Sequence, residues 1–297
     1  MIDVTSTLPP DAVGDGGTPP RLMRAALRLW RIRIGIALVV LLVAVAIIGP
    51  WVAPFGPAEF IGTPNTRNID GSWLGSDYLG QDVWSRFLHG GRSILFIATV
   101  ATLIGFVLGG AVGLTAAYDR GHLDDALMRF MDILLAFPQL LLALVALTTV
   151  GPKPWLIIAI VGFTTIPRIA RITRGATVSV VERDFVGAAE ALGESKFRII
   201  ISELLPNVTG PLLVEANLRL TYSIGIIAGL GFLGFATEVN AANWGSMVDE
   251  NRAAVTVQPW GVVLPAVAIA LLTIGTGLIT DGLARTVAGI DRGRPDA

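Results

Sequence analysis

The sequence predicts an all-α integral membrane protein with six transmembrane helices, and three observations lead to that prediction. Hydrophobic residues make up 53% of the 297 residues, whereas charged residues make up only 15%. A soluble domain carries about 25% charged residues, because its surface faces water. The apolar residues form long runs without charge, and basic residues are unevenly shared among the segments between these runs. A cytosolic enzyme, a disordered chain and, without Cys, a disulfide-stapled secreted domain are therefore excluded.

The first apolar run follows a polar segment. Residues 1–20 are rich in Pro and Gly and are expected to form a disordered cytoplasmic tail, because they can bury little. Residues 21–58 are expected to form an N-terminal anchor helix, whose apolar part, Ile34 to Phe55, exceeds the roughly 20 residues that a span needs. It is too long for the apolar core of a cleaved signal peptide. Residues 59–92 are then expected to form an extracytoplasmic loop and cap.

The other five spans are expected within residues 93–285. Four of them are long charge-free runs: Ser93 to Tyr118, Ile133 to Pro152, Leu220 to Thr237 and Ala253 to Thr280. The fourth span is shorter, because only Pro154 to Pro167 separates Lys153 from Arg168. These residues reach about 21 Å as a helix, whereas the bilayer core is about 30 Å thick. A span here requires both charged side chains to reach out from its ends; a re-entrant segment is the alternative.

The basic residues set the orientation of these spans. With both termini in the cytoplasm, 17 of the 22 Lys and Arg residues fall on the cytoplasmic side, as the positive-inside rule requires. Residues 286–297 then form a second cytoplasmic tail. Two spans contain glycines at helical spacing, for which packing inside the bundle is favoured over a dimer face: Gly105, Gly109, Gly113, Gly225, Gly229, Gly231 and Gly234.

The sequence lacks the motifs of an enzyme or of a self-sufficient transporter. Neither lysine, Lys153 or Lys196, stands in the G-K-[ST] pattern of a P-loop. The two histidines are far apart in the sequence, and no cluster predicts a metal site. Among the acidic residues only Asp132 and Asp281 come close to the spans, each at a predicted cytoplasmic end, and Asp132 is expected to pair with Arg129. A secondary transporter needing an intramembrane carboxylate is disfavoured. The net charge of −1 gives no reason to expect a nucleic-acid partner.

The loop between the fourth and fifth spans carries the most specific pattern. Arg168, Arg171 and Arg174 are spaced to run down a helix that leaves the membrane, and a short helix with small residues follows. Gly193 predicts a sharp turn after that helix, and Pro206 predicts a break beyond Leu205. A short helix with a small-residue face, held at the membrane surface, suits docking into a groove of another protein.

This loop, about residues 175–207, resembles the EAA loop of ABC importer permeases. The residues that match are Ala188, Ala189, Gly193, Leu205 and Pro206. Gly187 stands where the family has Glu, and Asp184 and Glu190 are the hypothesised substitutes for that charge. The resemblance implies that these eight positions contact an ATPase.

A second stretch, Ser72 to Leu95, resembles the motif before the second span in dipeptide/oligopeptide/nickel permeases. Its glycines favour turns, and its charged residues are expected to tie these turns into an outer cap; the cap positions are Gly75, Asp77, Gly80, Asp82 and Arg86. The short first outer loop and the N-terminal tail resemble the C-type subunit of these transporters.

The resemblance implies the type I importer permease bundle, with residues 93–285 as the permease core in the cell membrane. It also implies three kinds of partner: a second homologous permease, two ABC ATPase subunits or domains, and an extracytoplasmic solute-binding protein. ATP and Mg²⁺ would bind to the partner ATPases, and no cofactor would bind to this chain. Peptides are the expected solute; nickel or another small solute, and a secondary transporter or a membrane enzyme or assembly factor, are the alternatives. No substrate-contacting residue is assigned.

Overall fold

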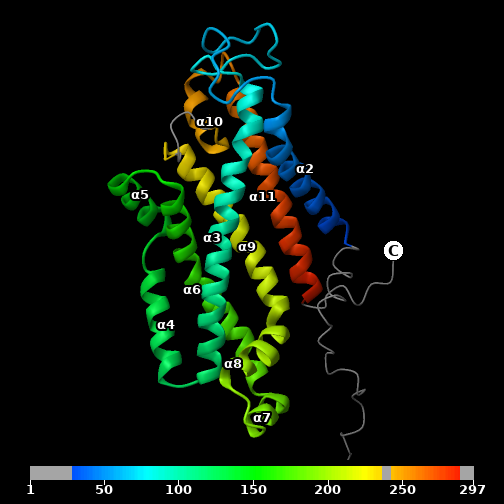
Figure 1. Cartoon of the computed structure of the whole chain (residues 1–297), viewed down its shortest axis with the longest axis vertical. Coiled ribbons are helices and arrows are strands. Elements are labelled where there is room, and N and C mark those ends of the chain that lie inside the picture. The colour runs from blue at the N-terminus through cyan, green and yellow to red at the C-terminus, as the bar shows by residue number, and fades with distance from the viewer. Residues whose placement is uncertain (1–28, 236–241, 288–297) are drawn as a thin grey trace, which may run out of the picture.

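The structure, a computed structural model, describes residues 29–235 and 242–287 and is a bundle of long helices (Figure 1). The predicted tail of residues 1–20 and most of residues 286–297 lie outside the described residues. The helices are α2 (Trp30–Val52), α3 (Val83–Asp119), α4 (His122–Leu135), α5 (Gln139–Val150), α6 (Pro154–Val181), α7 (Asp184–Ala191), α8 (Lys196–Arg198), α9 (Leu205–Phe232), α10 (Trp244–Asn251) and α11 (Trp260–Val287). The described residues contain five helices long and apolar enough to cross a membrane, and α4 with α5 passes the same test as a bent pair.

Helices α3 and α6 form the centre of the bundle and run parallel to each other. A Cβ atom on Gly105 would lie 2.9 Å from the Cβ of Thr165, and one on Gly113 would lie 2.6 Å from that of Thr173. The backbones approach this closely because glycine has no side chain, which is how small residues hold membrane helices together. The predicted packing role of the glycines in the second span is confirmed by these contacts.

The third predicted span, Ile133 to Pro152, is broken in the structure. Because α3 and α6 run in the same direction, the chain between them must return along the bundle. Helices α4 and α5 make this return, with a bend of 70° between them at residues 136–138. Pro138 disfavours helical backbone at the residue before it, Phe137, so the third predicted span is a bent pair of helices that begins earlier, at His122, rather than one straight helix.

Helix α6 is longer than the fourth predicted span. It continues through Pro167 to Val181 and has 28 residues, which at 1.5 Å per residue is about 42 Å. Arg168, Arg171 and Arg174 lie on this helix, as their spacing predicts. Since the helix is long enough to cross the bilayer core, no shortened span or re-entrant segment is needed here.

The predicted break at Pro206 is also wrong. Residues Lys196–Phe232 form one continuous helix of 37 residues, with a π-helical turn at Ile199–Leu204. In this turn the N–H of Leu205 donates to the carbonyl of Ile200, five residues earlier. The π turn changes the winding just before Pro206, whose ring would clash with the carbonyl four residues back in a regular α-helix. The fifth span therefore starts well before Leu220.

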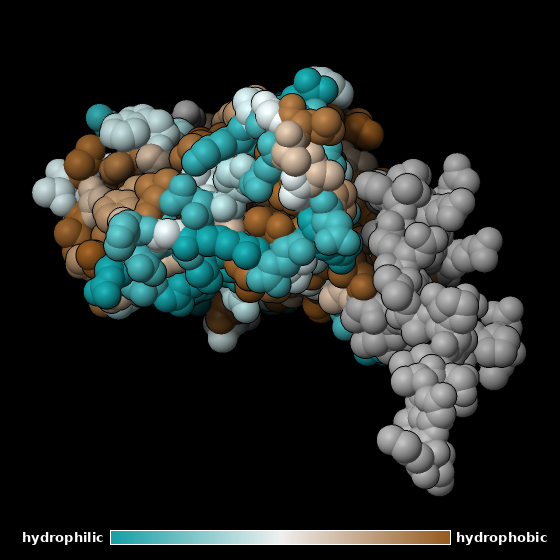
Figure 2. Space-filling view, turned by 90° about the horizontal axis from the view of Figure 1, so that it is seen from below, coloured by the Kyte–Doolittle hydropathy of each residue, from teal (hydrophilic) through white to brown (hydrophobic). Residues whose placement is uncertain are grey.

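The two ends of the bundle differ. One end, here called the α7 end, carries α7 and α8, and the other, the loop end, carries α10 and the pre-α3 loop of residues 53–82 (Figure 1). Arg31 at the start of α2 forms a 2.6 Å ion pair with Asp281 of α11, so these two helices, the first and last of the described residues, lie side by side. Seen from the α7 end, hydrophilic residues gather across the bundle, with hydrophobic residues at its edge (Figure 2).

Candidate functional site

Helix α7 ends in a turn that fixes its direction. The N–H of Gly193 donates to the carbonyl of Glu190 at 3.0 Å, and the N–H of Glu194 donates to that of Ala189 at 3.2 Å. This pair of bonds is the Schellman motif, which requires a left-handed residue after the helix. Gly193 supplies it with φ of +80°. The sharp turn predicted at Gly193 is confirmed.

One face of α7 is packed against the bundle. Val186 and Ala189 are 1% and 9% exposed and belong to a hydrophobic cluster. The other buried members come from four elements, which are α3 (Leu114), α6 (Val180), the π-helical turn (Ile199 and Leu204) and α9 (Val208 and Leu212). Leu205 packs against the same cluster. A displacement of α7 is therefore transmitted directly to the long helices α3, α6 and α9, because a close-packed cluster transmits strain.

The opposite face of α7 is uncovered. Gly187, Ala188 and Glu190 are exposed, as is Asp184 at the first position of the helix. The next residues continue this surface, with Leu192 82% exposed and Phe197 76% exposed. A Cβ atom on Gly187 would meet nothing within 4 Å, so a Glu side chain would fit at this position. Ala189 is the one predicted contact residue in the helix that points inward.

Ion pairs hold the helices around α7 together. Arg120, after α3, donates to the carbonyl of Val178 on α6 at 3.0 Å and pairs with Glu182. Arg174 on α6 binds both oxygens of Asp124 on α4, at 2.6 and 2.5 Å. Such a bidentate ion pair fixes the relative orientation of the two side chains as well as the distance between them. Helices α3, α4 and α6 are thus tied to one another at this end.

Asp132 on α4 forms its ion pair with Arg171 on α6 rather than with Arg129. The expected pair within one helix is therefore wrong. The i,i+3 spacing permits a contact between Arg129 and Asp132. The partner found in the structure, Arg171, lies on α6, and no pattern within α4 reveals it.

The five predicted cap residues come together at the loop end. Asp77 accepts hydrogen bonds from the N–H groups of Leu79 and Gln81, at 2.9 and 2.8 Å. Asp82 caps the start of α3 by accepting from the N–H of Ser85 at 2.7 Å. Charged side chains of this kind stabilise the positive N-terminal end of a helix. The two carboxylates therefore order the turn and the first residues of α3.

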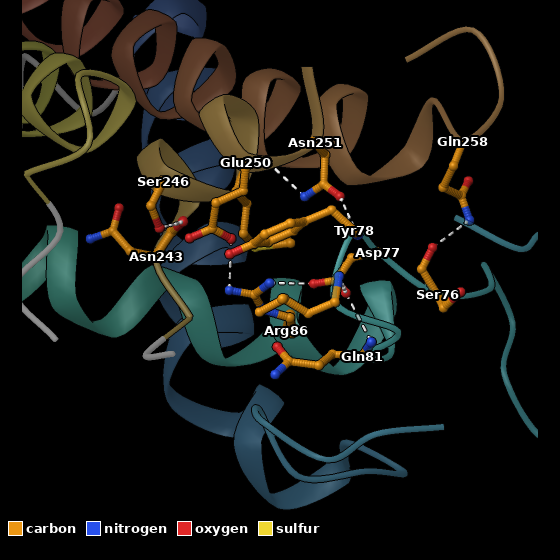
Figure 3. Close-up of polar contacts among 12 residues, drawn as sticks. Ser76, Asp77, Tyr78, Gln81, Arg86, Asn243, Ser246, Glu250, Asn251 and Gln258 are labelled. Atoms are coloured by element: carbon orange, nitrogen blue, oxygen red, sulfur yellow. Dashed lines mark hydrogen bonds and ion pairs between the residues drawn. The ribbon is translucent and has the colours of Figure 1, made fainter. Parts of the chain in front are cut away.

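Arg86 joins this turn to α10 (Figure 3). Its side chain and that of Asp77 are completely buried and form an ion pair. A second terminal nitrogen of Arg86 lies 2.9 Å from a carboxylate oxygen of Glu250 on α10. Burying an arginine is costly unless its charge is balanced. Here one carboxylate from the pre-α3 loop and one from α10 balance it.

The glycines of the turn have no room for a side chain. Gly75 and Gly80 have φ of +79° and +77°. A Cβ atom would lie 2.1 Å from the carbonyl oxygen of Thr66 at the first, and 2.2 Å from that of Gly62 at the second. Only glycine combines this backbone conformation with such close approach.

Several residues of this cluster are absent from the sequence prediction. Asn251 accepts from the N–H of Tyr78 at 3.1 Å, and Gln258 donates to the carbonyl of Leu74 at 2.7 Å. Trp244, fully buried, donates to the carbonyl of Phe87 at 2.8 Å. Nothing in the sequence alone connects Glu250 or Asn251 of α10 with the loop of Tyr78, which precedes Asn251 by 173 residues.

Burial and the carboxylate of Glu250 raise the pKa of the Tyr78 phenol above its usual value of 10.0, and Asp77 adds to the effect. The cause is that a phenolate would be poorly hydrated and would face negative charge. Tyr78 therefore stays neutral in the folded loop. Within residues 29–235 and 242–287, no group of three or more His, Asp or Glu side chains is placed to hold a metal ion.

Comparison with known proteins gives the family. The family described as binding-protein-dependent transport system inner membrane component matches residues 105–289. The di/tripeptide transport system permease protein DppC of Pseudomonas aeruginosa is 34% identical over 256 residues, covering 84% of both chains. The glutathione transport system permease protein GsiD of Escherichia coli is 34% identical over 247 residues, covering 82% of both.

A solved structure gives the fold. A chain of the MetNI methionine ABC transporter in an inward-facing conformation matches with a TM-score of 0.52 at 20% identity, covering 66% of this chain and 95% of that one. A second crystal form matches with a TM-score of 0.53. The helical bundle is thus the type I importer permease fold. The chain belongs to the family of binding-protein-dependent transport system inner membrane components, and is a non-catalytic permease subunit of an ABC importer in the cell membrane.

Proposed function

We propose that this chain forms half of a translocation pathway for di- and oligopeptides and that a second homologous permease forms the other half. Relatives that match over most of both chains are named as di/tripeptide and glutathione permeases, and glutathione is itself a small peptide. The solutes named for these relatives are therefore all small peptides, which supports a small peptide as the solute of this chain. An extracytoplasmic binding protein delivers the peptide, and two ABC ATPase subunits or domains supply the energy.

The attachment of α7 carries the mechanistic part of the proposal. Its inner face is buried in the cluster with α3, α6 and α9, and its outer face is uncovered. An ATPase that binds Ala188 and the neighbouring Gly187 on the outer face would, when it moves, displace the buried residues Val186 and Ala189 of the same helix. ATP-driven closure of the ATPases then rocks the long helices between inward-facing and outward-facing states. The α7 end lies in the cytoplasm in this arrangement.

The partners contribute what this chain lacks. ATP and Mg²⁺ bind to the ATPases, since neither lysine of this chain lies in a P-loop. Asp184 and Glu190, both exposed, offer the negative charge that Gly187 does not. The segment from Asp119 to Leu127, which joins α3 to the start of α4 at the same end of the bundle, forms a second contact through the exposed Leu123 of α4.

The loop end faces the binding protein in this proposal. The buried pair of Arg86 with Asp77 and the contact with Glu250 support a rigid platform rather than a mobile loop. A rigid surface lowers the entropic cost of docking. The exposed side chains around this platform, among them Trp73 and Phe60, meet the binding protein.

Reconstitution tests the proposal. Tagged chain is purified from cells that express the neighbouring transport genes, and the complex is placed in liposomes with the binding protein. We expect a P-loop ATPase and a second permease to copurify, and a labelled dipeptide to accumulate only with ATP. Ni²⁺ uptake without peptide uptake would contradict the peptide assignment. Uptake by this chain without any ATPase would contradict the importer mechanism and favour a secondary transporter.

A further inference from the structure

Helix α9 carries an ion pair within its membrane-spanning length. The Nε of Arg219 donates to Glu215 at 2.6 Å, and the two side chains are only 12% and 9% exposed. Arg219 lies 13 residues before Phe232, the last residue of α9, which is about 20 Å along the helix axis. Charged residues at such a depth are costly and mark solute or ion pathways. The pair escaped prediction because the fifth span was expected to start at Leu220.

The guanidinium of Arg219 is held in a fixed position, yet its two terminal nitrogens remain available for a further hydrogen-bond partner. Its central carbon lies 5.0 Å from the centroid of the Tyr222 ring, so that Glu215 and the ring fix it from two sides. Within the described part of the chain, no other side chain or carbonyl binds its two terminal nitrogens. These nitrogens form the edge of the fork that binds a carboxylate through two parallel hydrogen bonds.

The surface beside Arg219 is open. Tyr222 is 54% exposed, and Cβ atoms on Gly225 and Gly229 would meet nothing within 4 Å. The three residues lie on one face of α9, because they are separated by three and four positions. The packing role predicted for Gly225 and Gly229 is therefore wrong within this chain. A solute could approach the arginine along this face without displacing a helix.

A second arginine lies at a similar depth on the neighbouring helix. Thr102 of α3 is hydrogen bonded to Ser223, and Gly105, one turn further along α3, contacts Thr165 of α6. Arg219 and Arg168 each lie about one turn from these contacts, in the direction of the α7 end. Arg168 is exposed, and α6 packs against α9. Arg168, Arg219 and Glu215 thus bring a net positive charge to this part of α6 and α9.

We propose that Arg219 binds the carboxylate of the solute during its passage through the bundle, with Glu215 and Tyr222 as positioning residues. The inference rests on the proposed function, since a peptide carries a C-terminal carboxylate at neutral pH. A carboxylate is the group that matches a held guanidinium with a free edge, and the positive charge at this depth offsets the cost of bringing an anion into the membrane.

Uptake by the complete complex in liposomes tests the proposal. Binding protein saturated with a labelled dipeptide, or with the same dipeptide carrying a C-terminal amide, is supplied to wild type and to Arg219→Gln. We expect Arg219→Gln to lower uptake of the free acid at least tenfold and to reduce the acid-to-amide ratio at least fivefold. ATP hydrolysis stimulated by the binding protein should change less than twofold, and Arg219→Lys should retain part of the uptake.

The double variant Glu215→Gln/Arg219→Gln separates recognition from folding. It removes both charges of the buried pair, so its thermal stability and subunit assembly should match wild type more closely than those of Arg219→Gln. Uptake of the free acid should nevertheless stay low. Recovered uptake in the double variant, or an unchanged acid-to-amide ratio in Arg219→Gln, would show a purely structural pair. A wild-type complex that moves no peptide would instead overturn the proposed function, and this inference with it.

Discussion

Arg86 and Asp77 form an ion pair in which neither side chain has any exposure to solvent. Glu250 lies 2.9 Å from the same guanidinium but is itself 22% exposed. The arginine therefore links the pre-α3 loop, the start of α3 and α10. Removing one member of a buried pair leaves the other charge uncompensated, and this costs about 3–5 kcal/mol.

The first prediction concerns this arginine. Arg86→Gln should lower the free energy of unfolding by about 3–5 kcal/mol, because Asp77 stays buried without its partner. Unfolding in detergent, followed by circular dichroism, measures the change. Arg252→Gln is the matched control, since the Arg252–Asp249 pair is exposed and should cost less than about 1 kcal/mol. Equal losses in the two variants would contradict the role given to burial.

The second prediction concerns the contact between α3 and α6. A Cβ atom on Gly113 would lie 2.4 Å from the carbonyl oxygen of Ala170, whereas one on the nearby Gly110 would meet nothing within 4 Å. Gly113→Ala should therefore push the helices apart and destabilise the protein by about 1–3 kcal/mol. Gly110→Ala should be neutral or stabilising, because alanine favours the helix. Thermal unfolding of both variants in one detergent decides between these outcomes.

The third prediction concerns the turn after α7. Gly193→Val places a β-branched residue at φ of +80°, where a side chain costs about 1–2 kcal/mol. A Cβ atom there would meet nothing, so the cost is conformational and confined to the turn. We expect normal insertion, with uptake reduced strongly relative to ATP hydrolysis, because α7 would lose its fixed direction. Uptake per ATP at the wild-type level would refute the docking role of α7.

The fourth prediction is the counterpart on the same helix. Gly187 is exposed, lies inside α7 and has no neighbour within 4 Å of a Cβ atom. Gly187→Ala should stabilise α7 by about 0.5–1 kcal/mol, and Gly187→Glu should tighten binding of the ATPase if this position meets it. Measuring ATPase binding for both variants separates helix stability from charge. A weaker complex with Gly187→Glu would show that the glycine is required for close approach.

The fifth prediction is a pH effect at the loop end. Burial and Glu250 raise the pKa of folded Tyr78, so the folded state holds this proton more tightly than the unfolded chain. The contribution to stability is complete below about pH 10, the pKa of an unfolded tyrosine, and is lost as the pH rises through the folded pKa. Hydrogen exchange of the pre-α3 loop should accelerate above that pH. Tyr78→Phe should show a smaller acceleration, and an identical profile would exclude Tyr78 as the cause.

Local chemistry explains which features the sequence could predict. Gly193 was identifiable because a left-handed turn after a helix needs glycine, and Gly105 to Gly113 because close helix packing in lipid needs small residues. Both are properties of residues near one another in the chain. The same holds for the cap turn, whose glycines and carboxylates stand within one short motif, Gly75 to Arg86.

The features that escaped prediction depend on other helices. Asp132 pairs with Arg171 only because α4 lies against α6, and Arg86 meets Glu250 only because α10 folds over the pre-α3 loop. The span limits failed for a different reason. Counting charge-free runs hides a bend inside an apolar run, as before Pro138, and it starts a span too late where a charged pair such as Glu215 and Arg219 lies inside the helix.

The pairing of α2 with α11 has a consequence for biosynthesis. A Cβ atom on Gly282 would lie 2.2 Å from Ile32, and one on Gly35 would lie 2.6 Å from the backbone of Gly275. The ribosome makes α2 before α11. The N-terminal part of α2 must therefore remain in the bilayer without this neighbour until α11 has been made. The contact between the two helices forms only after α11 has been inserted, so a chain that stops before α11 leaves this surface of α2 uncovered.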